Sequence, residues 1–122
     1  MVLYLAADLI WASKIKGVGD AAGVACRPVR TLEMLEARLG DSDVRALVLD
    51  LDVPDMAMAM IARVRGCEKE AAGRRVRVLA WGPHVEVGLL KGAREAGADE
   101  VVTRGGFDHS MGETLKRLES GK

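Results

Sequence analysis

The chain has few of the residues that build metal sites or disulfide frameworks. Its 122 residues include two cysteines, two histidines and three prolines. Cys26 and Cys67 lie in apolar contexts without metal-ligand spacing, so we expect two reduced, mostly buried thiols and no disulfide. His84 and His109 also lack a partner at such a spacing. The sequence therefore predicts no metal site and a solvated His84, with His84 as a ligand or base left as the alternative.

The chain also lacks an excess of charge and a long apolar run. Lys plus Arg number 18 and Asp plus Glu number 18, so the formal net charge is zero. A neutral chain argues against a domain whose main partner is nucleic acid or an anionic membrane. No stretch approaches the apolar length that spans a bilayer, and the N-terminus shows no basic prelude of a signal peptide. We therefore expect a cytoplasmic protein without a membrane partner and predict no nucleic-acid partner.

Catalytic motifs are missing as well. The chain has no G-x-S-x-G motif, no Cys–His arrangement that can be placed, and no carboxylate pair suited to hydrolysis. Residues 17–22 formally match the dinucleotide-binding pattern G-x-G-x-x-G/A, but they fall near the end of a helical pattern instead of between a strand and a helix. We interpret these glycines as places where a helix approaches a sheet closely. These absences favour a non-enzymatic protein.

Arginines gather in the segment 63–77, where two glutamates interrupt them. The arginines are Arg63, Arg65, Arg74, Arg75 and Arg77. We interpret this segment as a solvated face of the protein. A weak site for nucleic acid or for an acidic partner is the alternative.

What the chain does have is a regular alternation of strand-like and helix-like segments. With 122 residues, of which 49% are hydrophobic, it is long and apolar enough for one folded domain. Strands are predicted at residues 2–6, 24–29, 44–49, 76–81 and 100–103. Helices are predicted at residues 9–22, 32–39, 55–69, 85–96 and 108–119. The predicted helix caps are Gly23, Thr31, Gly40 and Gly97.

This alternation predicts an α/β fold. Strands that alternate with helices of this length form right-handed βαβ units, which give a parallel sheet with helices on both faces. Five such units fit the flavodoxin-like, doubly wound strand order 2-1-3-4-5. Pro28 predicts that the second strand lies at an edge of the sheet. One domain spans residues 1–119, and residues 120–122 form a tail.

An acidic residue closes the most apolar of the predicted strands. Asp50 follows the run at 44–49 directly, and Asp52 and Pro54 come soon after it. In an open α/β sheet, ligands and chemistry gather at the carboxyl ends of the strands. Asp50 therefore lies where a functional residue is expected, and a helix-capping or loop carboxylate is the alternative interpretation.

Residues 49–56 resemble the phosphoacceptor loop of bacterial response-regulator receiver domains. In that family the third strand ends in an Asp and a Pro follows four residues later, as Pro54 follows Asp50. Residues 97–104 resemble the family's fifth strand, which ends in Thr/Ser–Lys–Pro, and Phe107 with Asp108 matches what commonly follows. The resemblance covers nearly the whole chain. It implies the CheY-like receiver fold and two-component signal transduction, with Asp50 in the place of the phosphoacceptor.

The resemblance also implies that most of the receiver's active site has been replaced. The two acidic residues that hold Mg²⁺ in the family fall on Ala6 and Ala7, with Asp8 one position later. The Thr or Ser at the end of the family's fourth strand is Gly82 here. The Lys at the end of the fifth strand is Arg104, and Gly105 stands in place of the Pro.

These replacements weaken phosphoryl transfer to Asp50. Such transfer depends on positioning and on neutralising the charge of the phosphoryl oxygens, and Mg²⁺ is usually held by one or two carboxylates. Asp52 only partly compensates, because the family uses a backbone carbonyl as ligand at that position. Arg104 keeps a positive charge in a planar fork, and our hypothesis is that it pairs directly with Asp50 and fixes the site in one state. The resemblance thus implies a degenerate pseudo-receiver without a cofactor, Mg²⁺ included.

Apolar residues near the predicted fourth helix indicate an interaction surface. Val87 and Leu90 are assigned to the outer side of that helix, and Val101 to the neighbouring strand. In receivers the face made by the fourth helix, fifth strand and fifth helix often mediates pairing. We therefore predict a protein partner, which is a sensor kinase, a downstream effector or a second copy of the chain. Scattered surface hydrophobic residues are the alternative.

Together these observations predict a non-enzymatic, receiver-like signalling or protein-interaction module that is not phosphorylated in the usual Mg²⁺-dependent way. One alternative is an atypical receiver that is still phosphorylated on Asp50. The other is a small-ligand-binding flavodoxin-like domain that uses a strand-end crevice near Asp50, Gly82 and Arg104.

Overall fold

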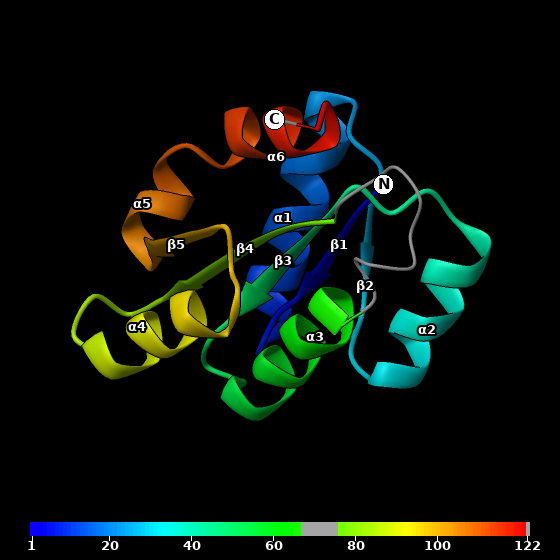
Figure 1. Cartoon of the computed structure of the whole chain (residues 1–122). Coiled ribbons are helices and arrows are strands. Elements are labelled where there is room, and N and C mark those ends of the chain that lie inside the picture. The colour runs from blue at the N-terminus through cyan, green and yellow to red at the C-terminus, as the bar shows by residue number, and fades with distance from the viewer. Residues whose placement is uncertain (67–75, 122) are drawn as a thin grey trace.

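A computed structural model describes residues 1–66 and 76–121 and shows a five-stranded sheet between two layers of helices (Figure 1). The strands are β1 (Val2–Leu5), β2 (Cys26–Pro28), β3 (Ala46–Asp50), β4 (Arg77–Gly82) and β5 (Glu100–Thr103). The helices are α1 (Leu9–Ala22), α2 (Leu32–Asp41), α3 (Pro54–Gly66), α4 (Val87–Ala96), α5 (Arg104–His109) and α6 (Met111–Glu119).

The predicted sheet topology is confirmed. The strand order is β2-β1-β3-β4-β5, and every neighbouring pair is parallel. β2 lies at an edge, as Pro28 predicted, because proline has no N–H to donate to a second neighbouring strand. β1, β3 and β4 form the interior of the sheet, and β3 is buried along its whole length.

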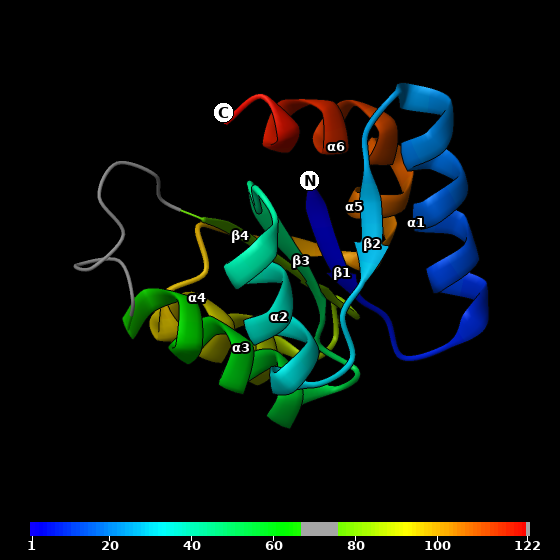
Figure 2. The same cartoon turned by 90° about the vertical axis from the view of Figure 1, so that its right-hand side faces the viewer.

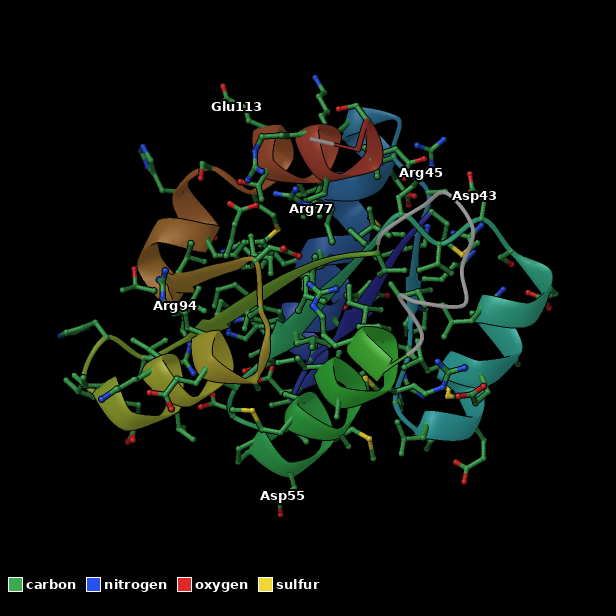
Figure 3. The ribbon with its side chains drawn as sticks, in the orientation of Figure 1. Asp43, Arg45, Asp55, Arg77, Arg94 and Glu113 are labelled. Atoms are coloured by element: carbon green, nitrogen blue, oxygen red, sulfur yellow. The ribbon has the colours of Figure 1, made fainter. Side chains whose placement is uncertain are left out.

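Alternating strand side chains divide the core between the two faces of the sheet. Figure 2 shows α2, α3 and α4 on one face and α1, α5 and α6 on the other. On one face, Leu47 and Leu49 pack under α2, α3 and α4. On the other, Val48 and Trp81 pack under α1, α5 and α6. Charged side chains such as Asp55, Arg94 and Glu113 lie on the outer surfaces of the helices (Figure 3). Both faces of the sheet are therefore covered, as a mostly apolar parallel sheet requires.

Three of the four predicted helix caps are confirmed. Gly23 and Gly97 end α1 and α4 in the left-handed conformation, with φ of 74° and 119°. Thr31 caps α2, and its hydroxyl accepts the backbone N–H of Met34 at 3.1 Å. The prediction that Gly40 ends α2 is wrong. Gly40 does not adopt positive φ, so α2 continues to Asp41 and is capped at Ser42.

The last predicted helix, at 108–119, is divided in two and begins earlier than expected. Thr103 caps α5 by accepting the backbone N–H of Gly106 at 3.1 Å, so the helix starts directly after β5, at Arg104. Ser110 interrupts the helical backbone with ψ of 26°, and α6 starts after it. The early start places Phe107 against the sheet, where it is 1% exposed.

The arginine-rich segment is less solvated than predicted. Arg65 is 14% exposed along its side chain, pairs with Asp99 at 2.6 Å, and donates to the carbonyls of Gly97 and Val76. Arg63 forms an ion pair with Glu36 on α2. Cys67, Arg74, Arg75 and the predicted end of the third helix lie outside the described residues. None of the helices within the described ranges is both long and apolar enough to cross a membrane.

Candidate functional site

Asp50 ends β3 at the carboxyl edge of the sheet, where the sequence placed it. Among the described residues, Asp50 is the charged residue that is fully buried, with 1% of its surface exposed. The pairing register sets it beside Trp81 of β4, and the strand alternation turns both side chains toward α1. The fully buried indole of Trp81 on that face helps to keep water from the carboxylate.

Both carboxylate oxygens of Asp50 accept backbone hydrogen bonds. The N–H of Ala7 donates to Oδ2 at 2.9 Å, and the N–H of Asp52 donates to Oδ1 at 2.9 Å. Burial raises the pKa of Asp50 most strongly; the two N–H groups lower it, the carboxylate of Asp52 raises it, and the charge of Arg104 lowers it least. The net effect is a raised pKa, so burial outweighs the two hydrogen bonds.

Ala6 and Ala7, which the sequence aligned with the receiver's acidic pair, follow the end of β1. Ala7 contacts Asp50 through its backbone N–H. Asp8 has a different role, because its carboxylate accepts the N–H of Trp11 at 2.9 Å and caps α1. Within residues 1–66 and 76–121, no group of three or more Asp, Glu, His or Cys side chains is placed to hold a metal ion. These residues do not fit the Mg²⁺ that the receiver fold implies.

Arg104 pairs with Asp52 and not with Asp50, so the predicted Asp50–Arg104 pair is wrong. Asp52 lies in the turn after β3, outside the strand, and its carboxylate reaches the guanidinium that follows β5. The two side chains are 37% and 42% exposed. Asp50 is more deeply buried than this ion pair and is connected to it through the N–H of Asp52.

Gly82 is buried at the end of β4, where an added side chain would be crowded. A Cβ at this position would lie 3.2 Å from the Cβ of Leu51 and 3.6 Å from Cδ2 of Leu90. The assignment of Leu90 to the outer side of α4 is therefore wrong, because it packs inward over Gly82. Val101 is likewise half-buried against the core, and Val87 alone of the three predicted interface residues is exposed, at 68%.

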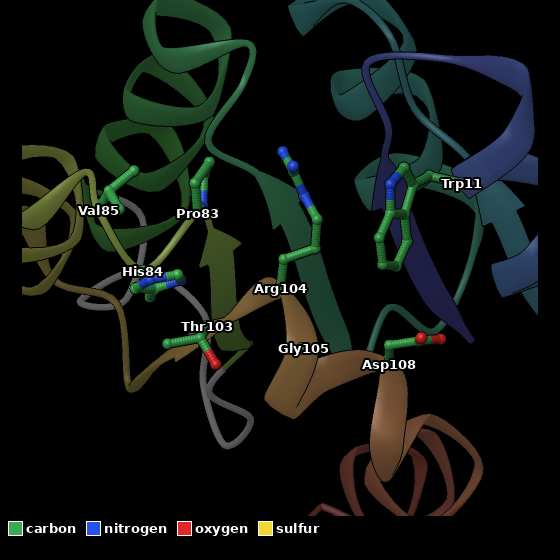
Figure 4. A pocket seen from close by; sticks show the side chains of 8 residues that line it. All are labelled: Trp11, Pro83, His84, Val85, Thr103, Arg104, Gly105 and Asp108. Carbon is green, nitrogen blue, oxygen red and sulfur yellow. The ribbon is translucent and has the colours of Figure 1, made fainter.

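Sequence reasoning missed a pocket on the α1 side of the carboxyl edge (Figure 4). It measures about 610 Å³ and lies between α1, the loop from β4 to α4, and the start of α5. Its lining residues are Trp11, Pro83, His84, Val85, Thr103, Arg104, Gly105 and Asp108. Of the predicted crevice residues, Arg104 lines this pocket, whereas Asp50 and Gly82 do not.

An aromatic cluster forms the inner wall of the pocket. Trp11 lines the pocket and packs on Trp81 and Phe107, with ring centroids 5.9 and 6.4 Å away. Trp81 and Phe107 contact each other at 4.8 Å. Three of the chain's four aromatic residues thus meet at one place, which their wide spacing in the sequence did not reveal.

Comparison with solved structures identifies the fold. The receiver domain of NtrX from Brucella abortus superimposes with a TM-score of 0.78, at 14% identity over 100% of both chains. The chain has the fold of a response-regulator receiver domain. The receiver of Saccharomyces cerevisiae Ssk1, solved with the phosphotransfer protein Ypd1, gives a TM-score of 0.80 at 12% identity, covering 98% of this chain and 88% of that one.

Two further comparisons show how much of other solved chains this fold covers. A beryllofluoride-activated NtrC4 receiver dimer gives a TM-score of 0.73 at 18% identity, covering 98% of this chain and 95% of that one. A longer NtrX chain from Brucella abortus, solved with ADP, gives a TM-score of 0.76 at 15% identity. The match covers 98% of this chain but only 26% of the longer one. No family model and no curated protein matches the sequence.

Proposed function

We propose that the chain is a receiver-like signalling module that acts by contacting another protein, without Mg²⁺-dependent phosphorylation of Asp50. The observation that supports this most is the state of Asp50, which is 1% exposed and accepts a backbone N–H on each oxygen. Phosphoryl transfer needs a carboxylate oxygen that a phosphodonor reaches in line. Burial and the two N–H groups oppose that approach.

The charges around Asp50 support the same proposal. Mg²⁺ needs oxygen ligands in near-octahedral geometry, and it is commonly anchored by carboxylates. Ala6 and Ala7 supply none, and the carboxylate of Asp8 is used to cap α1. The carboxylate of Asp52 is neutralised by Arg104. The positive charge that the metal brings to a receiver is thus replaced, in this proposal, by a built-in guanidinium.

A protein partner is supported by the distribution of exposed apolar side chains. The large hydrophobic residues exposed in the described part of the chain are Leu9, Ile10, Leu32, Val85 and Val87. Each lies in a loop after a strand or at the first turn of a helix, so all of them share the carboxyl edge of the sheet with Asp50. Exposed apolar residues that gather on one side of a protein mark an interaction surface.

The solved neighbours offer two models for such a partner. The Ssk1 receiver was solved with a phosphotransfer protein, and the NtrC4 receiver as a dimer. A kinase-side or effector-side protein, or a second copy of the chain, is the partner that we propose here. Its contact would include the carboxyl edge, where Val87 is the exposed member of the three interface residues that the sequence suggested.

Incubation of the full chain with acetyl phosphate and Mg²⁺, followed by intact mass measurement, tests this function. We expect no acyl-phosphate mass increment on the unaltered chain. An increment that disappears in Asp50→Asn would overturn the proposal and support the atypical receiver still phosphorylated on Asp50. A triple variant, Ala6→Asp/Ala7→Asp/Arg104→Lys, restores the receiver residue types beside Asp50 and is expected to gain labelling that the unaltered chain lacks.

A further inference from the structure

We propose that the pocket between α1, the β4–α4 loop and α5 binds a small molecule that carries a flat aromatic ring and an anionic group. This inference concerns a different cavity from the Asp50 site and does not rest on the signalling role proposed above. The pocket volume of about 610 Å³ lies within the range of small-molecule sites, roughly 300–1,000 Å³. Its chemistry indicates which molecules fit.

The apolar part of the pocket suits a flat ring. Trp11 forms one wall and is held in place by Trp81 and Phe107 behind it. Pro83 and Val85 lie on the other side, and Figure 4 shows the Arg104 side chain between them and Trp11. Tryptophan offers a large and rigid contact surface, and aromatic rings pack well on it in stacked or edge-to-face arrangements.

The polar part of the pocket favours an anion. Arg104 and His84 line it, while the carboxylate of Asp108 is already ion-paired with Lys14. The Nε of Arg104, which lines the pocket, is buried and donates to no acceptor among the described residues. Buried N–H donors are normally paired, so this one indicates a position for an acceptor in the pocket. A carboxylate or phosphate oxygen is the acceptor that matches a guanidinium best.

Gly105 lines the pocket and leaves open space beside its backbone. A Cβ built there meets no atom within 4 Å, and the residue's φ is not in the left-handed region. A larger residue is therefore tolerated by the backbone at this position and projects from the pocket lining. Gly105→Leu is expected to occupy space that the ligand needs.

Arg104 connects the pocket to the Asp50 loop. Its guanidinium pairs with Asp52 in the structure, so an anion in the pocket competes with Asp52 for the same cation. The ligand would thereby release Asp52, whose backbone N–H bonds to Asp50. This competition predicts the direction of one effect: removing the charge of Asp52 should strengthen binding of the anion.

Nuclear magnetic resonance of the ¹⁵N-labelled full chain tests the proposal directly. The sequence has two tryptophans, and both belong to the aromatic cluster, so two indole N–H signals report on the pocket. The probes are AMP and benzoate, each with a ring and an anion, and adenosine and inorganic phosphate, each with one of the two. We expect AMP and benzoate to shift the Trp11 signal saturably at millimolar concentration or below, and the two half-probes to bind at least about tenfold more weakly.

The variants separate this site from nonspecific binding. Arg104→Gln should weaken AMP binding about tenfold or more, the usual effect of losing a charged hydrogen bond. Asp52→Asn should strengthen it by up to about fivefold, because the exposed ion pair that it removes is weak. Gly105→Leu should abolish it. Arg94→Gln, an exposed charge change on α4, is the control that should leave binding unaltered.

Three results would overturn the proposal. The first is that neither AMP nor benzoate moves an indole signal saturably, which would leave the pocket to a side chain of a partner protein. The second is that adenosine binds as tightly as AMP, which would remove the role of the anion. The third is equal AMP binding by Arg104→Gln and the unaltered chain. The conclusion does not depend on Gly105→Leu folding, because Arg104→Gln and Asp52→Asn provide two further variants.

Discussion

Restoring a hydroxyl residue at the end of β4 should destabilise this chain, although receivers carry Thr or Ser there. A Cβ at Gly82 lies 3.2 Å from the Cβ of Leu51, an atom fixed to the backbone of a fully buried residue. Neither atom can turn away, so the crowding is of the overpacking kind that costs about 1–3 kcal/mol. Replacing a strand glycine recovers about 0.5–1 kcal/mol of backbone entropy. The net loss is about 1 kcal/mol for Gly82→Ala, and about 2 kcal/mol for Gly82→Ser because its hydroxyl also loses water.

Urea unfolding followed by tryptophan fluorescence measures this loss, since Trp81 precedes Gly82 and is fully buried. Gly40→Ala is the matched control: its Cβ meets nothing within 4 Å, and helix propensity should make it more stable by about 0.5–1 kcal/mol. Two results would refute the reasoning. One is a Gly82→Ser variant as stable as the unaltered chain, and the other is a Gly40→Ala variant that loses as much as Gly82→Ala.

Three further predictions concern buried polar groups. Since burial raises the pKa of Asp50, the folded state binds a proton more readily than the unfolded one, and this group's contribution to stability is present below about pH 4 and lost as the pH rises through the folded pKa. The free energy of unfolding of the unaltered chain minus that of Asp50→Asn should therefore fall with pH across that window, and a flat difference would contradict it. Arg65→Met removes a cation that pairs with the mostly buried carboxylate of Asp99 and should cost about 3–5 kcal/mol in urea unfolding, whereas a loss below about 1 kcal/mol would show that the pair is not needed. Burial, followed by the charge of Glu119, raises the pKa of Cys26 to about 11, so peptide mapping should find this thiol slow to alkylate at pH 8 until urea is added; rapid labelling of the folded chain would disprove its burial.

The sheet was predictable because its signals are local and repeated. Each strand and helix carries its own apolar pattern, and the right-handed crossover rule then leaves few topologies. The start of α5 was missed because Gly105 and Gly106 are poor helix formers. In the structure the cap from Thr103 and the burial of Phe107 outweigh that local preference.

The sequence predicted which residues gather at the site, but it paired Arg104 with the wrong carboxylate. Strand ends alone bring Asp50, Gly82 and Arg104 to one edge, but a turn decides which carboxylate faces the guanidinium. That turn places Asp52 outward and folds its N–H back onto Asp50. The pocket beside them was missed because it depends on the contact of Trp11, Trp81 and Phe107, which no spacing in the sequence encodes.

The guanidinium of Arg65 ties the last turn of α3 to the residues that precede β4 and β5, at the end of the sheet far from Asp50. Three separate segments thus share one anchor, and the carbonyl of Gly97 at the end of α4 is part of it. We therefore expect that a partner bound at the N-terminal end of α4 would rotate this helix about its C-terminal end at Gly97. Sliding of α4 along the sheet would have to break that anchor first.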